Sequence, residues 1–74
     1  MKQRNSVSVF VKEKRKKLHL TQVELAKKAG VGLRFVRDLE QGKKTLRMDK
    51  VNQVLDLFGS ELAPVKSSYE EIDD

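Results

Sequence analysis

Residues 20–42, LTQVELAKKAGVGLRFVRDLEQG, decide the fold of this 74-residue chain. The stretch opens with a capping box, in which the Thr21 hydroxyl is expected to accept the backbone N–H of Glu24 while the Glu24 carboxylate reaches back. Gly30 then ends the helix. These signals predict a helix of about two turns between Thr21 and Gly30. Its inward residues are Leu25, Ala26 and Ala29.

A second short helix is predicted over 33–41, after a turn of only a few residues. Val36 and Leu39 have the spacing of one helical face, and Gly42 closes the segment. Gly32 stands where a side-chain cap would be, and glycine at that position costs only a few tenths of a kcal/mol relative to Ser or Thr. Two short helices joined by a turn that contains glycine are a helix-turn-helix unit.

Two further helices flank this unit in the sequence. The first is predicted over 7–18, with Ser6 as its cap, and its inward residues are Val7, Val11 and Leu18. His19 follows as a turn residue for which we expect a positive φ. The last helix is predicted over 47–58 and ends at Gly59; its inward residues are Met48, Val51, Val54, Leu55 and Phe58. The fold class is therefore all-α, a small four-helix bundle with a central helix-turn-helix.

The two ends of the chain have a different character from the helical body over 6–59. Residues 1–5 are polar and unpatterned, so we expect a flexible arm. Residues 60–66 alternate between polar and apolar, which predicts a short C-terminal strand that Pro64 confines to a sheet edge. Residues 67–74 carry four acidic groups and are expected to be disordered when the chain is alone.

Composition excludes several classes of function. One histidine and no cysteine leave few groups for catalysis, so we expect no enzyme activity, no metal site, no cofactor and no small-molecule substrate. Apolar runs are too short to span a membrane, which places the protein in the cytoplasm, on the nucleoid. Residues 1–60 carry 15 Lys and Arg against six Asp and Glu, a balance of +9 that is typical of a polyanion-binding protein.

The block 20–31, LTQVELAKKAGV, together with Leu39-Glu40 and Gly42-Lys43, resembles the XRE family of Cro and phage-repressor helix-turn-helix proteins. The resemblance covers about residues 7–59 and implies a lambda-repressor-like fold that binds double-stranded DNA. Within the family, the phrase VLDLFGSEL at 54–62 is most similar to HipB-type antitoxins, which pair with HipA-type kinase toxins. The resemblance therefore implies a transcriptional repressor that is the antitoxin of such an operon.

The second helix of the unit is the one expected to lie in the major groove, with its N-terminal residues at base edges. The candidate base-reading residues are Gly32, Leu33, Arg34 and Arg37. Arginine suits guanine because its two-pronged donor matches O6 and N7, and one such pair discriminates by about 1–3 kcal/mol. The candidate phosphate-binding residues are Thr21, Gln22, Lys43, Lys44 and Thr45. The resemblance further implies a structural ion pair between Arg15 and Glu40.

One short recognition helix covers few base pairs, so specific binding is expected to need a homodimer on a palindromic operator. The candidate dimer interface consists of Leu57, Phe58, Leu62, Ala63 and Val65, with residues 60–66 of two copies pairing as an intersubunit ribbon. The acidic tail either docks on a kinase toxin or only aids solubility. Two alternatives stay open for the whole chain: a stand-alone XRE-family regulator without a toxin, and a basic RNA-binding adaptor.

Overall fold

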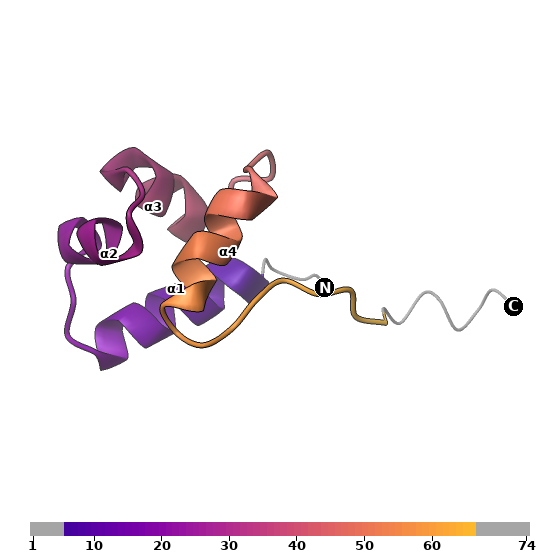
Figure 1. The fold of residues 1–74 in the computed structure, drawn as a ribbon, viewed down its shortest axis with the longest axis horizontal. Coiled ribbons are helices and arrows are strands. Elements are labelled where there is room, and N and C mark those ends of the chain that lie inside the picture. Colours follow the sequence, from indigo (N-terminus) through magenta and orange to yellow (C-terminus); the bar gives the residue numbers. More distant parts are fainter. Residues whose placement is uncertain (1–5, 67–74) are drawn as a thin grey trace, which may run out of the picture.

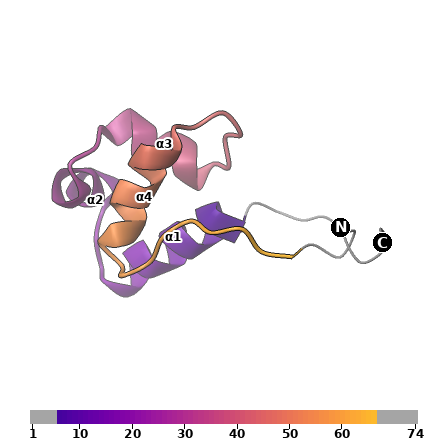
Figure 2. The same cartoon turned by 45° about the vertical axis from the view of Figure 1, so that its right-hand side comes forward.

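The computed structural model describes residues 6–66, which form four α-helices (Figure 1). Their bounds are α1 Ser6–Lys17, α2 Gln22–Ala29, α3 Leu33–Glu40 and α4 Met48–Asp56. In Figures 1 and 2, α1 runs along the base and α4 crosses it, while α2 and α3 close the opposite side. α3 packs against both α1 and α2, and α2 also contacts α4. Within 6–66 no helix is long and apolar enough to cross a membrane.

A single apolar core joins the four helices. Its buried residues are Val11, Leu25, Ala26, Val36, Leu39, Val51, Val54 and Leu55, so every helix contributes at least one. Burying one such aliphatic side chain stabilises a fold by about 1.5–3 kcal/mol, which makes this small set the main source of stability. Phe10 and Phe58 meet edge to face beside the core, with ring centroids 6.3 Å apart.

The predicted helix ends of the central unit are confirmed. Thr21 Oγ1 accepts the backbone N–H of Glu24 at 3.0 Å, and the N–H of Thr21 donates to the Glu24 carboxylate at 2.8 Å. Gly30 ends α2 in the left-handed region at φ 75°, a conformation that glycine adopts without steric cost. His19 has φ 58°, as predicted, and is the one described non-glycine residue with positive φ.

Two predicted core residues are exposed instead. Leu18 is 55% exposed because α1 ends at Lys17, one residue before the predicted end, so the chain has already turned. Met48 is 70% exposed because it is the first residue of α4, which reaches the core only at Val51. Both errors follow from extending a helical face to the outermost residue of a helix.

The predicted strand is absent from the described chain: residues 60–66 form no helix and no strand. A strand needs a second strand beside it, and residues 6–59 offer only helices and their connections. The segment is instead held to α4, because the Leu62 N–H donates to Asn52 Oδ1 at 2.7 Å and the Leu62 side chain packs against the core. The predicted flexible arm at 1–5 and disordered acidic tail at 67–74 lie outside the described residues.

Candidate functional site

The turn between α2 and α3 fixes the angle at which α3 is presented. The N–H groups of Gly30 and Val31 both donate to Ala26 O, at 2.9 and 3.0 Å. Gln53 of α4 donates its side-chain amide to Ala29 O at 3.0 Å and to Gly30 O at 3.1 Å. Carbonyls that the end of α2 leaves unpaired are thus satisfied by a side chain from α4. The turn is therefore tied to α4 by hydrogen bonds.

α3 has one buried and one exposed face, as its sequence pattern predicts. Val36, Leu39 and Glu40 are buried, whereas Arg34 and Arg37 are exposed, with 84% of the Arg34 side chain accessible. Gly32 is exposed at the start of the helix, and a Cβ built on it would meet nothing within 4 Å. Leu33 is half-buried beside it. Three of the four predicted base-reading residues therefore lie at the start of α3, and Arg37 follows in its last turn.

The inner face of α3 is locked to the rest of the protein by Glu40. Arg15 Nε lies 2.6 Å from Glu40 Oε2, and Arg15 Nη2 donates to Oε1 at 2.9 Å. Arg15 Nη1 also donates to Leu20 O at 2.9 Å, so one guanidinium joins α1, the α1–α2 turn and α3. Only 2% of the Glu40 side chain and 13% of the Arg15 side chain are exposed. The structure thus brings together the two residues of the expected ion pair.

Gln22 is the third member of this network. Its side-chain amide donates to Glu40 Oε1 at 3.1 Å, so the start of α2 is also attached to the end of α3. Burial alone would raise the pKa of the Glu40 carboxyl, but the hydrogen bonds from Arg15 and Gln22 and the neighbouring positive charge outweigh burial and hold the pKa below its ordinary value. An amide NH2 has two hydrogens, so Gln22 keeps a second donor for a ligand at the start of α2.

The remaining candidate phosphate-binding residues flank α3. Lys43, Lys44 and Thr45 are exposed in the connection between α3 and α4. Thr21 is exposed at the start of α2, although its hydroxyl is engaged in the capping box. The two groups belong to opposite ends of the helix-turn-helix unit, and the Gln22–Glu40 contact keeps the start of α2 close to the end of α3.

One charged residue of α3 was not among the predicted site residues. Asp38 Oδ1 lies 3.6 Å from Arg34 Nε, and Asp38 Oδ2 lies 3.6 Å from Lys43 Nζ. The signal was present in the sequence, since Arg34 and Asp38 have the i, i+4 spacing at which opposite charges meet on a helix. Gln53 was also missed, and here no local signal exists, because its partners lie 23 and 24 residues away along the chain.

The five candidate interface residues lie away from α3, around the last turn of α4 and the segment 60–66. Leu57 is 39% and Val65 84% exposed, Ala63 is exposed, and Phe58 and Leu62 are half-buried. A hollow between α1 and this segment is lined by Ser6, Val7, Phe10, Leu55, Ser60, Glu61, Leu62, Ala63 and Val65. Figures 1 and 2 show the segment passing along α1, on the side of the molecule opposite α3. The two candidate surfaces are therefore separate.

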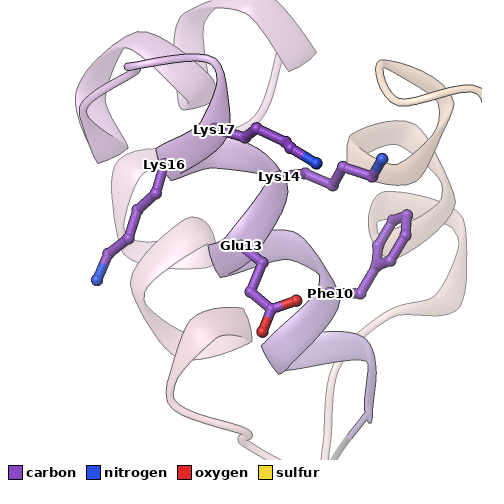
Figure 3. Close-up of a pocket in the computed structure, with 5 residues that line it drawn as sticks. All are labelled: Phe10, Glu13, Lys14, Lys16 and Lys17. Carbon is purple, nitrogen blue, oxygen red and sulfur yellow. The ribbon is translucent and has the colours of Figure 1, made fainter.

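A basic hollow on α1 is a different kind of surface (Figure 3). It is lined by Phe10, Glu13, Lys14, Lys16 and Lys17, and no residue of α2 or α3 takes part. Lys14 Nζ lies 5.6 Å from the centroid of the Phe10 ring, whereas Lys16 points away from Lys14 and Lys17. The three ammonium groups do not converge on one point, so the hollow lacks the geometry of an anion site.

The part of the chain that forms the four helices is similar to known proteins. The family model described as Helix-turn-helix matches residues 11–65, which include α2, α3, α4 and most of α1. An uncharacterized HTH-type transcriptional regulator from Sinorhizobium fredii is 51% identical over 53 residues, which are 72% of this chain and 70% of that protein.

Proposed function

The chain belongs to the XRE-type helix-turn-helix family of DNA-binding transcriptional regulators, and on that premise we propose that it is a sequence-specific repressor that reads its operator through α3. The observation that carries the proposal is the exposed pair Arg34 and Arg37, backed by the buried face of Val36 and Leu39. A helix fixed on its inner side and cationic on its outer side suits the major groove, because guanine presents two acceptors there.

Phosphate contacts on both sides of α3 would position the helix without reading sequence. Lys43, Lys44 and Thr45 are proposed for one side, and Thr21 and Gln22 at the start of α2 for the other. The N-terminus of α2 adds unpaired backbone N–H groups and the positive end of the helix dipole. Each phosphate neutralised by a lysine is expected to steepen the dependence of log K on log salt by about 0.9.

The proposed repressor acts as a homodimer on a palindromic operator, with two α3 helices about 34 Å apart. The surface proposed for the two-fold contact is Leu57, Phe58, Leu62, Ala63 and Val65, with segments 60–66 pairing as a ribbon. Its support is the exposed apolar area at the end of α4 and along the segment. Pairing would also supply the second strand that residues 60–66 lack in one chain.

A toxin partner is the finer part of the proposal. The similarity of 54–62 to HipB-type antitoxins favours a HipA-like kinase as the partner, encoded beside this gene. Binding of the kinase would increase the affinity of the dimer for DNA. The test is whether the product of the neighbouring open reading frame is a kinase and forms a complex with this protein. A chromosomal neighbour of another kind, or a kinase that does not bind, leaves a stand-alone regulator.

The DNA proposal is tested with two alanine variants on a panel of duplexes. The operator is first selected from a random-sequence duplex library, and each of its base pairs is then substituted in turn. Arg34→Ala should lose discrimination at one or two base pairs, by about tenfold, whereas Lys44→Ala should weaken all sequences alike. If the two variants behave identically, the assignment of base reading to α3 fails. Tighter binding of single-stranded RNA than of any duplex would favour the RNA-binding alternative.

The dimer proposal is tested with Val65→Asp, because that side chain is 84% exposed and its loss should leave the folded chain intact. Val23→Asp on α2, at 46% exposure, is the matched control. Light scattering should show a monomer for Val65→Asp and a dimer for the control. A dimer in both cases would place the two-fold contact elsewhere.

A further inference from the structure

We propose that Asp38 increases the preference of α3 for its operator over other DNA sequences. It does so by positioning Arg34 for a base and by repelling DNA phosphates near Arg34 and Lys43. The inference rests on the proposed function, since it concerns how the same DNA surface selects its site. Asp38 is half-buried on α3, between a candidate base-reading residue and a candidate phosphate-binding residue. Each of its carboxylate oxygens lies 3.6 Å from a different one of these cations.

The nitrogen of Arg34 that Asp38 contacts determines which hydrogen-bond donors of Arg34 remain available for a base. At 3.6 Å the contact to Nε is an ion pair rather than a hydrogen bond, so the terminal nitrogens Nη1 and Nη2 stay available as donors. These are two of the donors of the guanidinium fork, and a fork can donate to guanine O6 and N7 together. The Arg34 side chain is otherwise 84% exposed, so without Asp38 it would sample many rotamers before binding. Asp38 is therefore a positioning residue for Arg34.

The Asp38 side chain is largely shielded from solvent, and its backbone is bonded to the connection that follows α3. Only 22% of the Asp38 side chain is exposed, and the backbone N–H of Lys43 donates to Asp38 O at 3.0 Å, which fixes the start of the α3–α4 connection against α3. A negative charge fixed in a DNA-facing surface is repelled by the phosphate backbone. Binding to non-cognate DNA is almost entirely electrostatic, so this charge weakens non-cognate binding more than cognate binding.

The test is Asp38→Asn, which keeps the size of the side chain and removes its charge. Asp56→Asn is the matched control, because Asp56 is an exposed acid at the end of α4 and its loss changes the net charge equally. Binding is measured by fluorescence anisotropy on two duplexes, the operator selected from a random library and a scrambled sequence of the same composition. Each duplex is titrated at several salt concentrations.

Asp38→Asn should bind the scrambled duplex about fivefold more tightly at about 0.15 M salt, the effect of one further phosphate contact, and should steepen the salt dependence by about 0.9. Its affinity for the operator should be unchanged or lower, so the ratio of the two affinities falls by about fivefold or more. Asp38→Glu, which keeps the charge, should recover most of this ratio.

Two results overturn the inference while leaving the proposed function intact. One is a ratio of operator affinity to scrambled-duplex affinity that in Asp38→Asn lies within about twofold of the ratio for the unsubstituted protein. The other is a fall in this ratio in Asp56→Asn that equals the fall in Asp38→Asn, which would assign the effect to net charge alone. If the unsubstituted protein enriches no sequence from the library, the proposed function itself fails and the inference falls with it.

Discussion

The ion pair between Arg15 and Glu40 gives the sharpest prediction about stability. Arg15→Met removes the guanidinium but keeps a long apolar side chain that can cover the same part of α1. Glu40 then loses both of its bonds to Arg15, at 2.6 and 2.9 Å, and keeps only the amide of Gln22. With 2% of its side chain exposed, the carboxylate cannot recover water in exchange.

The magnitude follows from this burial. Removing one partner of a buried pair costs about 3–5 kcal/mol, and the partial exposure of Arg15 places the effect at the lower end, about 3 kcal/mol. A chain of this length is expected to have a free energy of unfolding of roughly 4–11 kcal/mol. The substitution should therefore lower the melting temperature by about 12–24 °C, since 1 kcal/mol corresponds to about 4–8 °C in a domain of this size.

The assay is urea unfolding followed by circular dichroism, with Arg47→Met as the control. Arg47 pairs with Asp49 at 2.7 and 3.2 Å, a geometry close to that of Arg15 and Glu40, but both side chains are more than 60% exposed. Exposed pairs contribute about 0–1 kcal/mol. Equal losses in the two variants would refute the argument that burial, rather than the number of charged contacts, determines the cost.

Three further predictions concern acid stability, the α2–α3 turn and the capping box. Because the Glu40 pKa is held below its ordinary value of 4.5, its charge stabilises the fold above that pH, and the free energy of unfolding should fall as pH drops further; a midpoint in urea that is the same at pH 6 and pH 3 would contradict this. Gly30→Ala should cost about 1–2 kcal/mol in urea unfolding, since φ is 75° and the new Cβ would lie 3.2 Å from Gln53 Nε2. The control Gly32→Ala has open space around the new Cβ and should change the free energy of unfolding little. Equal costs in the two variants would refute the reasoning. Thr21→Ala should lose about 1 kcal/mol through the cap, and an unchanged melting temperature would show that the capping box contributes nothing.

Features that depend on a few neighbouring residues could be predicted from the sequence. The capping box at Thr21, the end of α2 at Gly30 and the positive φ of His19 each involve one turn of chain, and all three are present. The exposed face of α3 followed from helical periodicity in the same way. In each case the physical cause lies within four residues, so the local pattern is sufficient.

Features that depend on distant partners could not be predicted in this way. The bonds from Gln53 to the α2–α3 turn join residues more than 20 positions apart, and nothing in the local pattern marks them. The alternation over 60–66 predicted a strand, but alternation shows only that one face can be buried, and in the single chain Leu62 is half-buried against the helical core. The position of Met48 depends on where α4 meets the core, which the periodicity alone does not give.

The most direct test of base reading by α3 couples a change in the DNA to a change in the protein. Each guanine of the selected operator is replaced in turn by 7-deazaguanine, which removes the N7 acceptor from the major groove and leaves the minor groove intact. The unsubstituted protein should lose about fivefold or more in affinity at one guanine, and Arg34→Ala should show no further loss at that position. Equal losses in both proteins, or no loss at any guanine, would contradict the account.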